Sequence, residues 1–332
     1  MRSAVRLVVV LLVLVLASAG TLRAQGMTGV TIFEAWFIHN ESMGDPVAVN
    51  KGFYKKLNLD VRVVGGGPGL SPIDRTMAEA KKGTVVFGVD YPYNILEARE
   101  KQKLPLVVVA HDFQKSAVRL ISWKELKSPR DIEGTVATWI GYDKQIKAAI
   151  GPDWDKRIKI VNQQGDPATI GSWLKKDYQY AHAMIYNEVL VAKRNTKDTY
   201  FVYTFPDFGI DWPENVLFTT EDIVRKYPEA VQAFVTGRYQ GYKYALANRR
   251  ETFQILLKYN SNLKGGEAHE LEGMAAIETI MVAETSRKNG LGYIDPAGWE
   301  RVAKDMMKAN LFKAMPDHKG AFTTKFPSKV MP

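Results

Sequence analysis

Hydrophobic residues in the first part of the chain form short runs that alternate with segments of helical spacing. The short runs are rich in β-branched and aromatic residues and predict strands over 30–36, 59–64, 84–89 and 104–110. Apolar residues at helical spacing predict helices between them, over 46–57, from Ser71-Pro72 onward and over 93–102. Strands that alternate with helices in this way are typical of a parallel sheet with crossover helices.

A second series of the same kind begins near residue 118. Strands are predicted over 118–122, 135–139, 157–162, 180–185 and 199–203, with helices over 144–150, 167–176 and 187–194. After residue 220 the pattern is helical throughout, over 221–226, 228–248, 250–259, 267–288 and 296–309. Helices alone after two α/β series predict a chain that crosses back to cover the first unit.

The chain is therefore predicted to form two α/β lobes joined by a hinge. The first lobe combines 25–117 with 216–332, and the second lobe spans 118–215. Because no long flexible linker separates the two series, extended crossings near 112–118 and 204–216 are expected to form the hinge.

The first 24 residues have the pattern of a cleavable secretory signal. A basic start precedes an unbroken apolar run from Leu7 to Ala17, and Ala24 offers a small residue before Gln25. The run is shorter than the roughly 20 residues that span a bilayer, although an uncleaved anchor is the alternative. The sequence contains no cysteine, which excludes disulfides, thiolate nucleophiles and a lipid anchor on cysteine. We therefore expect a soluble protein in a periplasm.

Composition and charge narrow the class of protein further. Of the 332 residues, 46% are hydrophobic and 24% are charged, which fits a globular protein with hydrophobic cores. The net charge is +9, or +6 without the three arginines of residues 1–24, and the basic residues are scattered rather than clustered. Nucleic acid is therefore not an expected partner, while anionic partners are weakly favoured.

A search for catalytic chemistry finds no motif. The five histidines do not have the spacing of metal ligands, and no G-x-S-x-G or G-x-x-x-x-G-K-[ST] sequence is present. The run from Gly65 to Gly69 lacks dinucleotide-binding spacing and is either a tight turn or a loop that contacts a ligand. A triad assembled from distant residues stays open. The pattern favours a binding protein, without a cofactor or a metal, over an enzyme.

Six segments, in order along nearly the whole mature chain, carry a family resemblance. They are Trp36 to Asn40, Lys51 to Tyr54, Phe87 to Asp90, Ser128 to Gly134, Tyr186 to Glu188 and Ala321 to Phe326. Together they resemble the NMT1/THI5-like substrate-binding proteins of ABC transporters, a family related to sulfonate and taurine receptors.

This resemblance implies a type II periplasmic-binding-protein fold, in which two α/β lobes clamp a small-molecule solute. It also implies an ABC permease and its ATPase as partners, and we expect a monomer. The pyrimidine synthases of the same superfamily use a cysteine-rich motif, which this chain lacks. Synthase activity is therefore not expected.

Residues that follow the predicted strands are the candidate ligand contacts, since ligands of open α/β sheets lie beyond the carboxyl ends of strands. They are rich in aromatic rings and include two carboxylates: Trp36, Asn40, Gly67, Asp90, Tyr91, Trp139, Tyr142, Tyr186, Asn187 and Glu188. With the resemblance, this set predicts a flat nitrogen heterocycle such as a thiamine-precursor pyrimidine or riboflavin. Trp36 and Trp139 would stack on it from opposite lobes, and Asp90 and Glu188 would accept hydrogen bonds from ring N–H groups.

Each of these residues also has a purely structural interpretation. The aromatic rings could pack in the core, Asp90 could cap the following helix, and Glu188 could interact with a helix dipole. Two other functions stay open: a receptor for a small anion such as a sulfonate, taurine or nitrate, and a secreted enzyme on the same scaffold. If the ligand contacts are correct, Trp36→Ala and Glu188→Ala each weaken binding and leave the melting temperature of the empty protein nearly unchanged.

Overall fold

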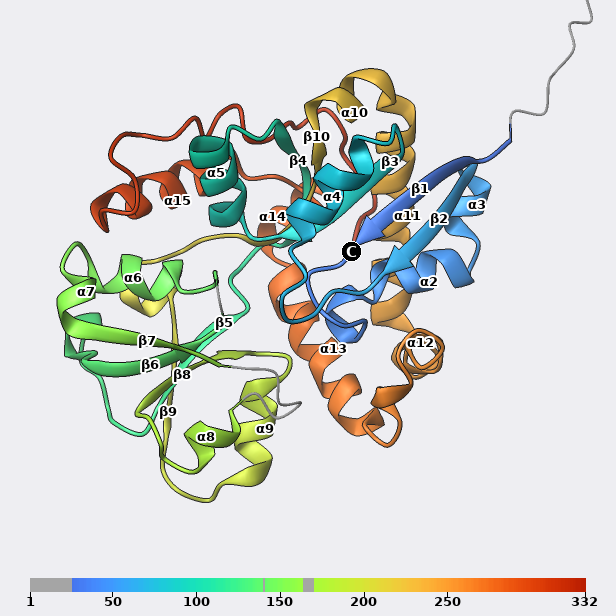
Figure 1. The fold of residues 1–332 in the computed structure, drawn as a ribbon. Helices are drawn as coiled ribbons and strands as arrows, with labels where there is room; N and C mark the ends of the chain where they lie inside the picture. The colour runs from blue at the N-terminus through green and yellow to red at the C-terminus, as the bar shows by residue number, and fades with distance from the viewer. Residues whose placement is uncertain (1–25, 140, 164–169) are drawn as a thin grey trace, which may run out of the picture.

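The computed structural model describes residues 26–139, 141–163 and 170–332, which form two β-sheets with helices around each (Figure 1). The predicted α/β fold of two lobes is confirmed. The predicted signal segment 1–24 lies outside the described residues, as does the first part of the helix expected over 167–176. None of the helices in the described ranges has the length and apolar character that crossing a bilayer requires.

The sheet of the first lobe has the strand order β2-β1-β3-β10-β4. Its strands are β1 Thr28–Phe33, β2 Leu59–Val64, β3 Val85–Asp90, β4 Leu106–Phe113 and β10 Glu214–Thr220. Strand β1 is parallel to β2 and β3, whereas β10 is antiparallel to β3 and β4. The prediction of a parallel sheet is therefore wrong at β10, because this strand enters the sheet as the chain returns from the second lobe.

The sequence pattern does not predict β10, although all seven of its residues are buried. Polar residues occupy both of its ends, with Glu214 and Asn215 at the start and Thr219 and Thr220 at the finish. These side chains have partners inside the protein; the Thr219 hydroxyl, for example, donates to the Val86 carbonyl at 2.6 Å. Because these polar residues can be buried with such partners, β10 lacks the continuous apolar run that normally marks a central strand.

The sheet of the second lobe has the order β7-β6-β8-β5-β9. Its strands are β5 Val118–Ser122, β6 Gly134–Thr138, β7 Ile158–Asn162, β8 Tyr180–Met184 and β9 Phe201–Thr204. Strand β6 is parallel to β7 and β8, whereas β5, the strand by which the chain enters this lobe, is antiparallel to β8 and β9. The entering strand and the returning strand thus break the parallel order in the two sheets.

Helices surround both sheets (Figure 1). Those that follow the first-lobe strands are α2 Gly44–Asn50, α3 Phe53–Lys56, α4 Pro72–Ala80 and α5 Pro92–Gln102. The second lobe has α6 Lys144–Ile150, α7 Trp154–Arg157, α8 Gly171–Leu174 and α9 Glu188–Asn195. The returning chain adds α10 Glu221–Lys226, α11 Pro228–Ala247, α12 Arg249–Leu256, α13 Glu267–Met281, α14 Glu284–Asn289 and α15 Pro296–Lys308. Short 3-10 turns are η1 Asn40–Ser42, η2 Pro129–Asp131, η3 Pro206–Phe208 and η4 Ser261–Leu263.

Two of the predicted helices are interrupted. The segment 46–57 is divided at Gly52, whose φ of 71° is left-handed and ends the first helix. The segment 267–288 is divided after Met281, because Ala283 is extended and separates α13 from α14. Neither break is marked by proline, so the apolar spacing continues across both.

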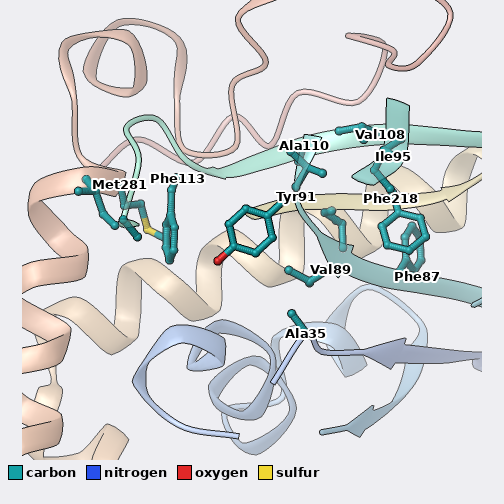
Figure 2. Packing of buried hydrophobic residues seen from close by; sticks show 14 of the residues in the cluster. Ala35, Phe87, Val89, Tyr91, Ile95, Val108, Ala110, Phe113, Phe218 and Met281 are labelled. Carbon is teal, nitrogen blue, oxygen red and sulfur yellow. The ribbon is translucent and has the colours of Figure 1, made fainter. Parts of the chain in front are cut away.

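The hydrophobic core of the first lobe lies between its sheet and these helices. Figure 2 shows part of it, where the side chains of Phe87, Ile95, Val108 and Phe218 come together from β3, α5, β4 and β10. On another side, the Phe87 ring stacks on Phe234 of α11 with centroids 4.1 Å apart. Phe234, Tyr239 and Tyr242 of α11 are buried in this core. The returning helix thus covers the first lobe, as predicted.

Helix α11 approaches α2 closely through a glycine, which leads to a stability prediction. A Cβ atom at Gly241 would lie 2.0 Å from the Gly44 carbonyl oxygen. Alanine in a helix interior is normally better than glycine by about 1 kcal/mol. Here we expect Gly241→Ala to lower the free energy of unfolding by about 1–3 kcal/mol instead, because the helices are forced apart. Chemical denaturation would measure this. Gly29→Ala, with no atom within 4 Å of the added Cβ, serves as the control; equal stability of the two variants would contradict the packing argument.

Candidate functional site

A cavity of about 390 Å³, here called the outer chamber, opens between the two lobes. Loops that follow β1, β2 and β3 line it from the first lobe, where Trp36, Gly67 and Asp90 lie. Loops that follow β6 and β7 line it from the second lobe, where Trp139 and Gln163 lie. Its volume falls within the range of small-molecule sites, about 300–1,000 Å³. The cavity is thus large enough for a small organic ligand.

A smaller cavity of about 40 Å³, here called the inner recess, lies beside the outer chamber. Both cavities are bordered by the same four residues, Ala35, Trp36, Trp139 and Tyr142. The recess has room for only a few water molecules, since one water needs about 10–15 Å³ of this kind of cavity volume. A ring-sized ligand therefore fits the outer chamber as it stands, with the shared aromatic residues between it and the recess.

Aromatic rings from both lobes meet around these cavities. Trp36 follows β1 of the first lobe, and Trp139 follows β6 of the second. The ring of Tyr91, at the end of β3, contacts Tyr142 of the second lobe edge-on, with centroids 4.7 Å apart. Tyr91 also stacks on Tyr93 at 5.2 Å. Aromatic side chains of both lobes therefore border the site, which suits a planar ligand.

The Asp90 carboxylate is buried at the wall of the outer chamber. Its Oδ1 atom accepts hydrogen bonds from the Tyr91 backbone N–H at 2.7 Å and from Asn94 Nδ2 at 2.8 Å. Within the described part of the chain, Oδ2 has no hydrogen-bond partner. Burial raises the pKa of Asp90 to about 6, although those two hydrogen bonds and the charge of Lys144 oppose the shift. Tyr91, not Asp90, is the N-cap residue of α5. Because both hydrogen bonds of Asp90 use Oδ1, its Oδ2 atom can accept a hydrogen bond from a ligand.

His39 and Glu41 form a polar group with Tyr186 at the inner recess. Of these three residues, the sequence predicted only Tyr186 as a ligand contact. His39 Nε2 lies 3.3 Å from Glu41 Oε2. Burial lowers the pKa of His39, but the hydrogen bond and charge of Glu41 outweigh it, so that pKa lies above its ordinary value. Burial acts to raise the pKa of Glu41, but hydrogen bonds from His39, Asn215 and Tyr186 outweigh it. The pKa of Glu41 therefore lies below its ordinary value. The two groups therefore favour their charged forms, and Tyr186 connects them to the second lobe.

Glu188 and Asn187 line the inner recess and also form hydrogen bonds within the protein. Glu188 is 2% exposed; its Oε2 atom accepts from the Met184 backbone N–H at 2.8 Å, and its Oε1 atom accepts from Asn187 Nδ2 at 2.7 Å. Asn187 Oδ1 lies 2.8 Å from His269 Nε2 of the first lobe. We therefore revise one expectation: Glu188→Ala removes the partner of a buried N–H and lowers stability by about 1–3 kcal/mol as well as affecting the site.

The structure brings nine of the ten predicted contact residues to the two cavities, and Asn40 is the exception. Asn40 is fully buried and lines neither cavity. Its backbone N–H donates to Glu270 at 2.9 Å, and its side-chain Nδ2 donates to the Tyr186 carbonyl at 3.5 Å. Asn40 therefore links the first lobe to Tyr186 of the second lobe, and its contact with a ligand stays a prediction.

Acidic side chains outnumber basic ones around the site. The outer chamber is lined by Asp74, Asp90 and Glu97 against the single cation Lys144, whose Nζ atom lies 3.3 Å from Glu97 across the cleft. The inner recess adds Glu41 and Glu188 against His39. Among the described residues that line the cavities, five carboxylates thus face two basic groups, although the whole chain is basic. In residues 26–139, 141–163 and 170–332, no three His, Asp or Glu side chains form a group that could hold a metal ion.

Comparison with known proteins gives a family match. A family model described as NMT1/THI5 like matches residues 39–252, which is more than half of the chain. This segment contains all of the residues named above as lining the two cavities, except Ala35 and Trp36.

Two curated proteins and a solved structure add detail. The formylaminopyrimidine-binding protein of Halalkalibacterium halodurans is 24% identical over 315 residues, which cover 88% of this chain and 89% of that protein. The riboflavin-binding protein RibY of Chloroflexus aurantiacus is 30% identical over 114 residues, 34% of this chain and 32% of that protein. The periplasmic aliphatic sulphonate-binding protein of Escherichia coli is 12% identical with a TM-score of 0.60, covering 90% of this chain and 92% of that one. The similarity to this last protein concerns the fold alone.

Proposed function

The chain belongs to the NMT1/THI5-like family, and we propose that it is the solute-binding protein of an ABC importer that captures a flat nitrogen heterocycle between its lobes. The observation that carries this proposal is the outer chamber, which Trp36 borders from one lobe and Trp139 and Tyr142 from the other. Aromatic faces on two sides match a planar ring, and each stacked pair adds about 0.5–1.5 kcal/mol beyond area burial.

The charges at the site favour a ring with N–H donors over a small anion. A sulfonate or nitrate would enter a chamber in which Asp74, Asp90 and Glu97 face one lysine that is already paired with Glu97. A buried anion without donors is strongly disfavoured. An amino group or ring N–H, by contrast, supplies the donor that Asp90 Oδ2 lacks. The sulphonate-binding neighbour supports only the fold of this chain.

An aminopyrimidine is the first candidate solute, and a flavin is the second. The formylaminopyrimidine-binding relative aligns along 88% of the chain, whereas the riboflavin-binding relative aligns along 34%. Both ligands have a flat ring with N–H donors. The bound ring would favour closure of the lobes by touching both of them, since a ligand shifts a conformational equilibrium only through contacts that differ between the states. An exported, closed protein would then deliver the solute to a permease without changing it chemically.

Ligand-induced stabilisation tests this function directly. The purified protein would be melted with an aminopyrimidine, riboflavin, taurine, an alkanesulfonate and nitrate in turn. A binding ligand at about 100 times its Kd stabilises the folded state by about 2.7 kcal/mol. We expect a raised melting temperature with the aminopyrimidine or riboflavin and none with the anions. A shift with the anions alone would overturn the proposal, and conversion of any of these compounds would indicate an enzyme.

Affinity for the heterocycle should depend on pH through Asp90. Since the pKa of Asp90 is raised to about 6, its carboxylate is ionised and accepts an N–H bond above that pH, and is protonated below it. We expect affinity to rise between about pH 5 and 7 with a midpoint near 6, and Asp90→Asn to bind more weakly and to lose the rise with that midpoint. Calorimetric titration would measure both. Asp74→Asn, at the same chamber, is the matched control and should keep the pH dependence; a titration curve that Asp90→Asn leaves unchanged would remove Asp90 from the site.

A further inference from the structure

Glu214 lies where the two connections between the lobes meet. The first connection joins the end of β4 at Phe113 to the start of β5 at Val118, and the second joins the end of β9 at Thr204 to β10. Glu214 is the first residue of β10 and pairs in register with Phe113. Its side chain is fully buried. A carboxylate in this position touches both connections between the lobes.

The Glu214 carboxylate joins three pieces of the chain by short hydrogen bonds. Its Oε1 atom accepts from Ser116 Oγ at 2.7 Å and from Gln145 Nε2 at 2.6 Å, and its Oε2 atom accepts from the Ala117 backbone N–H at 2.6 Å. Ser116 and Ala117 belong to the first connection. Gln145 belongs to helix α6 of the second lobe. One side chain of the returning connection thus holds the outgoing connection and a helix of the opposite lobe.

Helix α6 carries part of the cleft wall. Lys144, the first residue of α6, and Tyr142, two residues earlier, both line the outer chamber. Lys144 also pairs with Glu97 of the first lobe at 3.3 Å. A change in how Gln145 is held therefore moves residues that face the ligand, although Glu214 itself lines neither cavity.

We propose that Glu214 is a positioning residue that couples the hinge to the cleft, because its carboxylate fastens helix α6 to both connections and so sets the separation of the lobes. It does not touch the solute. The coupling belongs to the hinge and is independent of which solute the cleft binds.

The protonation state of Glu214 controls how strongly it holds its three donors. Burial raises its pKa to about 7, while hydrogen bonds from Ser116, Ala117 and Gln145 and the charge of Arg119 oppose the shift. The other titratable groups that interact with it are phenols, Tyr91, Tyr93 and Tyr186, whose pKa values burial raises well above 10, so they remain neutral. His111 of β4 is also neutral, since burial lowers its pKa to about 3. Above pH 7 an ionised Glu214 binds all three donors, and below it the neutral acid binds fewer and more weakly.

The absence of cysteine makes a distance measurement between the lobes straightforward. Spin labels on Lys55→Cys of α3 and Lys156→Cys of α7, both exposed, report the separation of the lobes in the full, empty protein. We expect a narrow distance distribution at about pH 8 that broadens by about pH 5.5, with a midpoint near 7. In Glu214→Gln the distribution should be broad at both pH values.

Two further variants separate this coupling from a general loss of structure. Gln145→Ala leaves Glu214 attached to the connections but releases α6 from Glu214, so its distribution should be broad even at high pH. Glu97→Gln breaks a different contact of α6 with the first lobe, the ion pair of Lys144 with Glu97, and should keep the midpoint near 7. An unchanged pH midpoint in Glu214→Gln would overturn the proposal, as would a narrow distribution at all pH values in Gln145→Ala. Because no solute is present, these outcomes do not depend on the proposed function.

Discussion

Replacement of Arg238 by methionine is expected to lower the free energy of unfolding by about 3–5 kcal/mol. Arg238 of α11 is fully buried and is surrounded by three carboxylates. Its Nη2 atom lies 2.7 Å from Asp112 Oδ2, its Nη1 atom lies 3.3 Å from Glu34 Oε1, and Nη1 also contacts Asp45. Methionine has a similar length but no charge, so three acids would be left in the core without a cation.

The electrostatics of this buried group explain the size of the expected effect. Burial raises the pKa of Glu34 well above its ordinary value, and the charge of Arg238 opposes that shift. Burial also raises the pKa of Asp112, again against the charge and hydrogen bond of Arg238. Without the guanidinium, these acids either stay charged in the core or take up protons. Either outcome raises the free energy of the folded state and so lowers its stability.

Urea unfolding of Arg238→Met would measure the loss, with Arg225→Met as the matched control. Arg225 is exposed and pairs with the exposed Asp222 on the surface. Exposed ion pairs contribute about 0–1 kcal/mol, so the control should unfold almost as the parent protein does. Equal losses in the two variants would show that the buried cluster does not stabilise the first lobe.

Trp36→Ala is expected to weaken binding of the heterocycle by about 10- to 100-fold, or about 1.4–2.8 kcal/mol. The Trp36 ring borders both the outer chamber and the inner recess. It is only half-buried in the empty protein, so its removal opens little of the core. Loss of one of the two stacking faces should therefore appear mainly as a faster release of the ligand.

Calorimetry with the aminopyrimidine or flavin identified by melting shifts would measure this change. Phe37→Ala is the matched control, since Phe37 is the adjacent aromatic residue, is 51% exposed and lines neither cavity. The control should bind almost as the parent protein does. If Trp36→Ala binds as tightly as Phe37→Ala, the ring does not rest on Trp36.

Periodicity was sufficient to predict most of the fold. Strand β2 and helix α6 have the predicted bounds, because an apolar pattern and clear turn residues mark both ends. Strand β10 could not be predicted from periodicity, because its polar residues are buried with partners that are remote in sequence. These residues are Glu214, Asn215 and Thr219. The antiparallel direction of β5 and β10 follows from the path of the chain between lobes, which local pattern does not encode.

The rule that ligands lie beyond strand ends placed nine predicted residues at the cavities, because it depends only on strand positions. It did not identify the pairing of His39 with Glu41, or the role of Asn40, which depend on contacts with Tyr186, Asn215 and Glu270. Nor does the sequence place Glu214 at the hinge, since its three donors come from segments about 70 to 98 residues away. Long-range hydrogen bonds of this kind become visible only in the folded structure.

A crystal structure of the protein grown with the solute that co-purifies with it tests the central claim most directly. The expected density shows an unmodified planar nitrogen heterocycle in the outer chamber, with its faces toward Trp36 and Trp139 and an N–H group on Asp90. Density for the solute elsewhere on the protein, or for a small anion or a chemically altered product in the chamber, would contradict it.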